Sequence, residues 1–352
     1  KLPPMLGYLA AGVLIGPHAL ALAQDSAGVR HLGEFGVVFL MFAIGLEFSL
    51  PKLRAMRRHV FGLGLLQVLM TMVVSIGGSL LLAALFPAHW KMGWQTAVAL
   101  SGALAMSSTA IVVKLMAERL ELESEHGKRV MGILLFQDLA VVPLLVLIPA
   151  LGSSPDQLLE AVGFAMLKAT VLVTLLLVGG QRVMRWWLTL VARRRSEELF
   201  MLNLLLITLG LAWLTELAGL SLALGAFIAG MLVSETEYKH QVETDIRPFH
   251  DVLLGLFFIT IGMKLDWRSV VDHWVLVLLL TTLPVLFKFG LIAGLARLFG
   301  ATPGVALRTG LYLAQAGEFG FVLLSLTQSN GLVQPALMNP ILASMVLSML
   351  AT

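Results

Sequence analysis

The chain has 352 residues, of which 58% are hydrophobic and only 13% charged, and its mean hydropathy is +0.91. A soluble domain of this size does not show such values, so the composition predicts an all-helical protein that crosses a membrane many times. The absence of cysteine excludes disulfide frameworks, thiol catalysis and cysteine metal sites, and the eight histidines lack ligand spacing. Nothing in the composition indicates an enzyme or a nucleic-acid partner.

The apolar residues gather into runs, each of which we expect to cross the membrane. In chain order these twelve runs are residues 2–16, 30–48, 60–86, 94–117, 130–150, 158–181, 198–217, 220–233, 248–263, 274–296, 306–329 and 336–352.

Alternate loops between these runs differ strongly in charge. One set, residues 49–59, 118–129, 182–197, 234–247 and 297–308, holds sixteen Lys and Arg, whereas the loops of the opposite set hold four. Because positively charged loops remain in the cytoplasm, the first set and the C-terminus are predicted to be cytoplasmic.

Residues 182–197 mix Trp186, Trp187 and leucines with five arginines. This pattern predicts an amphipathic helix in the inner membrane interface. It divides the chain into two halves of a transport domain, residues 1–181 and 198–352.

Asp138 interrupts a run from Met131 to Leu151 that otherwise carries no charge. An ionised side chain at that depth is costly, and intramembrane acids usually mark a transport path for ions or protons. The alternatives are an aspartate that caps a neighbouring helix or pairs with a buried base.

Two runs have small and polar residues at their centres, Ser101–Thr109 in the fourth and Ala314–Gly320 in the eleventh. An odd offset of seven runs makes one segment descend while the other ascends, as an inverted repeat requires. Small residues also let intact helices pack closely. The pairing, with Asp138 on the run next to the first interruption, favours two discontinuous helices at mid-membrane.

One carboxylate that binds either a proton or a monovalent cation couples the two fluxes and predicts one-for-one, electroneutral exchange. Asp138 is the predicted ligand for K⁺ or Na⁺, because such cations prefer oxygen ligands. Further oxygen atoms are expected from Ser107, Ser108, Thr109 and Gln137.

Three more polar residues of the second half are expected to support this site: Gln315, Glu318 and Lys288. Glu318 either neutralises the N-terminus of a half-helix or helps the ion path. Lys288 pairs with Asp138, with Glu318 or with the C-terminal end of a half-helix.

Two other classes of function are compatible with parts of the pattern. A channel needs a continuous pore, but no filter-like repeat such as TVGYG occurs in the chain. A membrane sensor would not need paired broken helices.

Several stretches resemble one transporter family: LGYLAAGVLIGP, GVVFLMFAIGLEF, GALAMSSTAIVVKLM, FQDLAVVPLL, LGAFIAGMLVSETEYKHQVETDIRPFHDVLLGLFFITIGMKLD and QAGEFGFVLL. They are similar to the membrane domain of the cation:proton antiporter-2 family, above all to the Kef-type glutathione-gated potassium efflux systems. The similarity covers essentially the whole chain. Residues 240–245, HQVETD, resemble the HALESD loop of that group.

The resemblance implies an inverted-repeat fold of thirteen helices, of which one precedes Lys1, and a homodimer that works by an elevator-like movement. It also implies K⁺ efflux in exchange for H⁺ at the bacterial inner membrane, with Asp138 as the shared site. A cytoplasmic nucleotide-binding domain would follow Thr352 and would be the place where nucleotide and glutathione act, and an ancillary subunit belongs to the same pattern. His240, Glu243 and Asp245 would form a regulatory loop.

Overall fold

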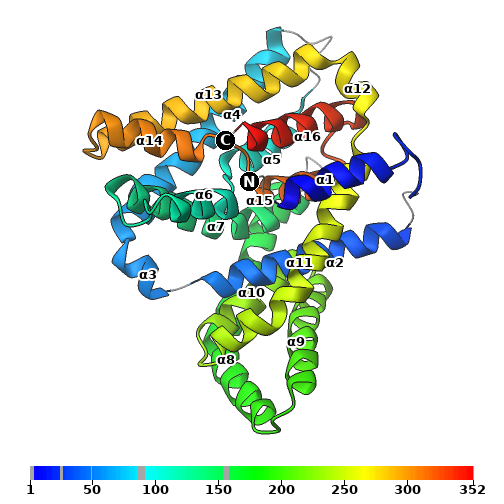
Figure 1. Cartoon of the computed structure of the whole chain (residues 1–352), viewed down its shortest axis with the longest axis vertical. Helices are drawn as coiled ribbons and strands as arrows, with labels where there is room; N and C mark the ends of the chain where they lie inside the picture. The colour runs from blue at the N-terminus through cyan, green and yellow to red at the C-terminus, as the bar shows by residue number, and fades with distance from the viewer. Residues whose placement is uncertain (1–3, 24–26, 49, 86–91, 154–157, 352) are drawn as a thin grey trace. The chain divides into compact units, whose positions relative to one another are not determined.

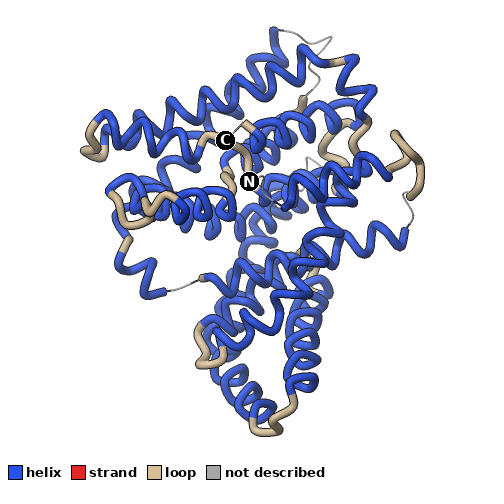
Figure 2. Tube along the Cα trace, viewed as in Figure 1, coloured by secondary structure: helices blue, strands red, loops and turns tan. Residues whose placement is uncertain are grey.

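The computed structural model describes residues 4–23, 27–48, 50–85, 92–153 and 158–351 (Figure 1). Throughout these residues the chain is helix and connecting loop, without a strand (Figure 2). The chain forms two compact units. Unit 1 comprises Lys1–Leu6, Pro51–Leu144 and Leu265–Thr352, and unit 2 comprises Gly7–Leu50 and Leu145–Lys264. Each unit therefore combines segments from both predicted halves of the sequence.

Unit 1 contains most of the helices that matter for the candidate site. They are α3 (Leu50–Ala55), a π-helical turn (His59–Gly64), α4 (Leu65–Leu85), α5 (Trp94–Ala105), α6 (Thr109–Glu118), α7 (Glu125–Leu151) as far as Leu144, α12 (Trp267–Asp272), α13 (Trp274–Leu298), α14 (Pro303–Leu313), α15 (Glu318–Ser329) and α16 (Pro335–Leu350).

The core of unit 1 is formed by branched and aliphatic side chains from α6, α7, α13 and α14. Val112, Ile133, Ile292 and Leu313 are each fully enclosed within it. Close packing of such side chains fixes the relative positions of the helices that bear them. The polar residues described below are therefore held by a rigid surrounding.

Unit 2 contains α1 (Pro4–Ile15), α2 (Ala27–Glu47), the end of α7, α8 (Leu158–Ala192), α9 (Glu197–Leu217), α10 (Leu222–Ser234) and α11 (Lys239–Lys264). Helices α2 and α10 cross with their backbones in contact. A Cβ atom on Gly45 would lie 2.1 Å from the carbonyl oxygen of Phe227, and one on Gly230 would lie 2.1 Å from that of Phe42. Only glycine permits this approach, which is a common device between membrane helices.

Each of the twelve apolar runs contains helix over most of its described residues, and the runs 94–117 and 306–329 are each interrupted near their centre. In the described part of the chain, five helical stretches are long and apolar enough to cross a membrane: His59–Ala84, Trp94–Glu118, Glu125–Leu151, Glu197–Leu217 and Trp274–Leu298. Shorter apolar helices cover Pro4–Ile15, Leu222–Ser234 and Leu337–Leu350. The protein is thus a multi-pass helical membrane protein, and the number of twelve crossings stays a prediction.

The amphipathic segment at residues 182–197 begins within a helix that is continuous with the preceding run and bends by 41° between Leu176 and Val178. Helix α8 continues from Leu158 through the expected boundary at residue 181 to Ala192. The reason is that Met184, Leu188 and Val191 extend its buried stripe at helical spacing, so nothing stops the helix there. It ends just before Arg195, whose φ is +53°.

The predicted loop 234–247 is also largely helical, because α11 begins at Lys239 rather than at residue 248. Val242 and Ile246, four residues apart, are buried on one face, while Lys239 and His240 contact Glu243 at 3.9 and 3.3 Å. Residues 239–247 are mostly polar, so the sequence pattern predicted a loop where an amphipathic helix forms. His240, Glu243 and Asp245 consequently lie on a helix in unit 2.

Some predicted features fall partly or wholly outside the described residues. These are the first residues of the run 2–16, the last residue of each of the runs 60–86 and 336–352, the first residue of the loop 49–59, and parts of the loops of the opposite set.

Candidate functional site

The first predicted discontinuity lies between α5 and α6 in unit 1. Helix α5 ends at Ala105, Met106 and Ser108 are extended, and α6 begins at Thr109. The Ser108 hydroxyl oxygen accepts a hydrogen bond from the Ile111 N–H at 3.1 Å and so caps α6. The break is confined to residues 106–108, because Ser101–Ala105 of the predicted segment remain helical.

The second discontinuity lies between α14 and α15 and touches the first. Helix α14 ends at Leu313, and α15 begins at Glu318. The Ser107 hydroxyl donates to the Leu313 carbonyl oxygen at 2.8 Å. A Cβ atom on Gly317 would lie 2.5 Å from the carbonyl oxygen of Ser107. The two interrupted helices therefore cross at their breaks, as the inverted-repeat pattern predicts.

Lys288, on α13, joins the two breaks and is only 1% exposed. Its Nζ donates to the Met106 carbonyl oxygen at 2.9 Å, to Ser107 Oγ at 3.0 Å and to the Gln315 carbonyl oxygen at 3.0 Å. A positive charge is favourable at the carbonyl ends of helices, and two half-helices, α5 and α14, end here. Of the three partners expected for Lys288, these contacts match the C-terminal end of a half-helix.

Glu318 lies at the N-terminal ends of the other two half-helices, α6 and α15. It is the first residue of α15, is 5% exposed, and accepts a hydrogen bond from the Ala110 N–H of α6 at 3.3 Å. An anion is favourable at a helix N-terminus, and Glu318 lies at the start of both α6 and α15. This geometry fits the first of its two expected roles, the neutralisation of half-helix N-termini.

Asp138 lies on α7 beside the first residue of α6. The Thr109 hydroxyl donates to its Oδ1 at 3.5 Å, and the carboxylate is partly buried. A carboxylate and a hydroxyl at the start of a half-helix are both hard oxygen ligands, of the kind that suits a monovalent cation. The structure therefore brings Asp138 and Thr109 together as expected.

Gln137 is buried, and its side-chain amide binds protein groups instead of facing Asp138 as a cation ligand would. Its Oε1 accepts from the Ser107 N–H at 2.8 Å, while its Nε2 donates to Gln67 Oε1 at 2.9 Å. The amide thus braces the first break. Ser107 and Ser108 are engaged likewise, since their hydroxyls bind Leu313 and Ile111. Thr109, one of the predicted oxygen ligands, contacts Asp138.

Gln67 was not among the predicted site residues, yet it completes the arrangement. It lies on α4, is fully buried, and its Nε2 donates to the Ala105 carbonyl oxygen at 3.2 Å and to Thr71 Oγ1 at 3.1 Å. It thereby satisfies a carbonyl at the end of α5. The signal for it was present in the sequence: Gln67 and Thr71 are polar residues one helical turn apart in a mainly apolar run.

Comparison with known proteins matches this architecture. The family model for the transmembrane sodium/hydrogen exchanger matches residues 1–352. The chain is 42% identical over 99% of its length to K(+) efflux antiporter 1, chloroplastic, from Arabidopsis thaliana, and spans 29% of that protein. It is 40% identical over 99% of its length to the putative K(+) efflux antiporter KefB from Alkalimonas amylolytica, and spans 52% of it.

A solved structure has the same fold. The sodium proton antiporter MjNhaP1 from Methanocaldococcus jannaschii is similar with a TM-score of 0.66 over 99% of this chain and 89% of that chain, at 14% sequence identity. The family match over the whole length, the crossed broken helices and the curated relatives agree. The chain belongs to the transmembrane sodium/hydrogen exchanger family.

Proposed function

We propose that this chain forms the transport part of a K⁺/H⁺ antiporter in which Asp138 binds either a proton or a K⁺ ion. The observation that carries the proposal is the contact between Asp138 and Thr109 beside the crossing of two broken helices. A cation that reaches Asp138 has a carboxylate and a hydroxyl as first ligands. A proton on the same carboxylate excludes the cation, so the two fluxes compete for one site.

Lys288 supports an electroneutral cycle. A lysine ammonium group has three N–H donors, and each has an acceptor here, at Met106, Ser107 and Gln315. A neutral amine has only two N–H bonds and would leave one of these acceptors unbound. In this proposal Lys288 stays a fixed cation during the cycle, and Asp138 alone exchanges charge.

The choice of K⁺ comes from the curated relatives, which are named as K(+) efflux antiporters at 40 and 42% identity. The second candidate is Na⁺/H⁺ exchange, favoured by the family description and by the solved sodium proton antiporter. The contact between Asp138 and Thr109 suits either cation.

The division of the chain into two compact units supports transport by an elevator-like movement. The candidate residues Ser107, Thr109, Asp138, Lys288 and Glu318 all belong to unit 1. One unit thus carries the whole ion site. The remaining parts of the proposal are a homodimer in the bacterial inner membrane with a cytoplasmic C-terminus and a further nucleotide-binding domain.

The test is proton flux in proteoliposomes that contain the purified chain. Outward gradients of Li⁺, Na⁺, K⁺ and Rb⁺ are applied in turn, and internal pH is followed with a fluorescent dye. We expect saturable proton movement with K⁺ and Rb⁺. Asp138→Asn should abolish it, because the amide neither releases a proton nor balances a cation.

The Asp138→Asn protein must also keep its thermal unfolding midpoint, so that lost flux is not lost folding. Full exchange by this variant would rule out the central role of Asp138. Flux with Na⁺ and Li⁺ alone would select the second candidate. Unsaturable flux without a counter-gradient would indicate a channel instead.

A further inference from the structure

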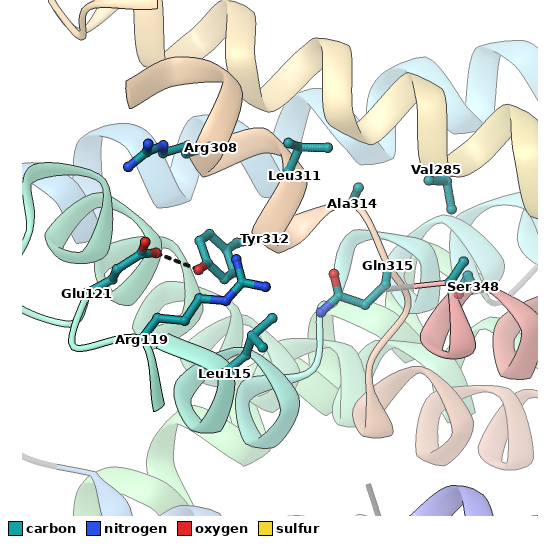
Figure 3. A pocket seen from close by; sticks show the side chains of 11 residues that line it. Leu115, Arg119, Glu121, Val285, Arg308, Leu311, Tyr312, Ala314, Gln315 and Ser348 are labelled. Carbon is teal, nitrogen blue, oxygen red and sulfur yellow. Dashed lines mark hydrogen bonds between the residues drawn. The ribbon is translucent and has the colours of Figure 1, made fainter. Parts of the chain in front are cut away.

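Unit 1 contains a second polar feature, a cavity of about 400 Å³ between α6, α13, α14 and α16. It reaches the second break, where Ala314 and Gln315 line it. The cavity has both apolar and polar lining residues. The polar side chains that enter it are Arg119, Glu121, Arg308, Tyr312, Gln315 and Ser348 (Figure 3).

Gln315 places an unsatisfied amide at the inner end of this cavity. The residue is 1% exposed, and neither its Nε2 nor its Oε1 has a hydrogen-bond partner among the described residues. Its side chain points into the cavity on the side where the Arg119 guanidinium lies (Figure 3). A buried amide without partners is costly, so such a group in a polar cavity indicates a ligand that completes its hydrogen bonds.

The charges around the cavity favour an anion. The lining includes two guanidinium groups, those of Arg119 and Arg308, and one carboxylate, that of Glu121. Glu121 is already engaged, because it accepts from the Tyr312 hydroxyl at 2.5 Å and contacts His126 Nε2 at 3.0 Å. The Tyr312 hydrogen bond, with a further contribution from His126, holds the pKa of the Glu121 carboxyl below its ordinary value. The lining thus keeps an excess of positive charge, which opposes the passage of a cation.

We propose that this cavity binds an oxyanion, a phosphate or carboxylate group, held by Arg119 and Arg308, with the Gln315 side-chain amide donating from the inner end. Guanidinium groups bind such planar or tetrahedral oxyanions through paired, charge-assisted hydrogen bonds. The oxyanion belongs either to a small soluble molecule or to the head group of an anionic lipid. Leu115, Val285 and Leu311 offer an apolar wall to the remainder of either ligand.

The site lies next to the ion-binding machinery without sharing side chains with it. The Gln315 carbonyl oxygen accepts from Lys288, whereas its side-chain amide faces the cavity. An oxyanion bound to that amide therefore holds the second break in its present arrangement. Binding is testable by itself and does not depend on which cation the protein exchanges.

The experiment measures binding to the purified full chain in two arms. In detergent, inorganic phosphate is titrated at constant ionic strength with chloride as the balancing anion, and heat is recorded by calorimetry. In nanodiscs, phosphatidylglycerol is compared with phosphatidylcholine, and lipid retained by the protein is counted by native mass spectrometry.

We expect saturable phosphate binding, or selective retention of phosphatidylglycerol, that weakens about tenfold in Arg119→Gln and in Arg308→Gln. Glu121→Gln should instead strengthen binding, because it removes the opposing negative charge. The matched control is Arg57→Gln, which neutralises an exposed arginine of the same unit that does not line the cavity. Gln315→Leu should weaken binding, and if it unfolds the protein the arginine variants decide.

Phosphate binding in detergent identifies a soluble ligand, and selective lipid retention alone identifies a lipid head group. Both results support the site when the variants respond as described. The proposal is overturned if neither probe binds, or if Arg57→Gln weakens binding as much as Arg119→Gln does.

Discussion

Lys288 donates three buried hydrogen bonds that join the two breaks of unit 1. Replacing it with Met removes the donor for the Met106 and Gln315 carbonyl oxygens while keeping much of the side-chain volume. Each carbonyl left without a partner costs about 1–3 kcal/mol. We expect Lys288→Met to lower the thermal unfolding midpoint in detergent clearly. An unchanged midpoint would contradict the view that the hydrogen bonds of Lys288 stabilise the two breaks.

The proposed electroneutral cycle also predicts an electrical result. A K⁺ concentration jump on a solid-supported membrane should give proton exchange with little sustained current, since Asp138 is neutral when loaded with either ion. A large transport current that disappears in Lys288→Gln, while proton exchange continues, would show that Lys288 releases a proton in each cycle. The scheme with a single exchanging carboxylate would then be wrong.

Substitution of Gln67 tests the buried hydrogen-bond network around the first break. Gln67→Leu removes the donor to the Ala105 carbonyl oxygen and the acceptor for Gln137. We expect the free energy of unfolding to fall by about 1–3 kcal/mol for each buried group left unsatisfied. The control, Thr71→Val, removes one hydrogen bond and should cost about 0.5–1.5 kcal/mol. Chemical denaturation in mild detergent compares the two, and equal losses would contradict this ranking.

The sequence identified the carboxylate of the candidate site more reliably than the residues that hold the surrounding helices in place. Asp138 stands out in the sequence because a lone carboxylate in an apolar run has few structural explanations. Gln137 was expected to bind the cation, whereas its amide is occupied by Ser107 and Gln67. Which polar groups face one another across α4, α5 and α7 depends on helix rotation, and a periodic pattern alone does not specify it.

At the scale of the helices, the crossing of the two breaks depends on Gly317. A methyl group there would lie 2.4 Å from the Ser107 carbonyl carbon, so Gly317→Ala forces the breaks apart. We expect loss of proton exchange in proteoliposomes and an overpacking cost of about 1–3 kcal/mol. Gly290→Ala, on α13, is the matched control, because no heavy atom lies within 4 Å of its new Cβ. Normal exchange by Gly317→Ala would show that the contact is dispensable.

The sequence predicted that two helices would break but not where each break begins. Ser101–Ala105 have the same small and polar character as residues 106–108, yet they stay helical. The break starts where Gln67 and Lys288 supply donors to the carbonyl oxygens of Ala105 and Met106. Gln67 lies 38 residues from Ala105 along the chain, and Lys288 lies 182 residues from Met106. Local helix propensity therefore cannot predict these contacts.

For the whole molecule, the charge asymmetry of the loops gives a topology that labelling can check. The chain contains no cysteine, so single cysteines can be introduced directly. Arg194→Cys and Asp272→Cys replace exposed residues in the two predicted classes of loop. We expect a membrane-impermeant maleimide to reach Arg194→Cys only from the cytoplasmic side and Asp272→Cys only from outside. The opposite labelling pattern would contradict the predicted orientation and the inverted repeat with it.

The two halves proposed from the sequence and the two compact units are different divisions of one chain. Unit 1 takes Pro51–Leu144 from the first half and Leu265–Thr352 from the second. Inverted repeats explain this interleaving, since equivalent helices of each repeat pack together. Apolar runs indicate where helices lie along the chain, but the assignment of each helix to a unit depends on contacts between residues far apart in the chain.

The backbone contact between α2 and α10 has a practical consequence for spectroscopy. Side chains change rotamer and let packed helices slide, but Gly45 and Gly230 leave no side chain to rearrange at the crossing. The distance between two spin labels placed on these helices should therefore keep a single narrow distribution in every condition. Such a pair supplies an internal standard against which the distance changes of other labelled positions can be measured.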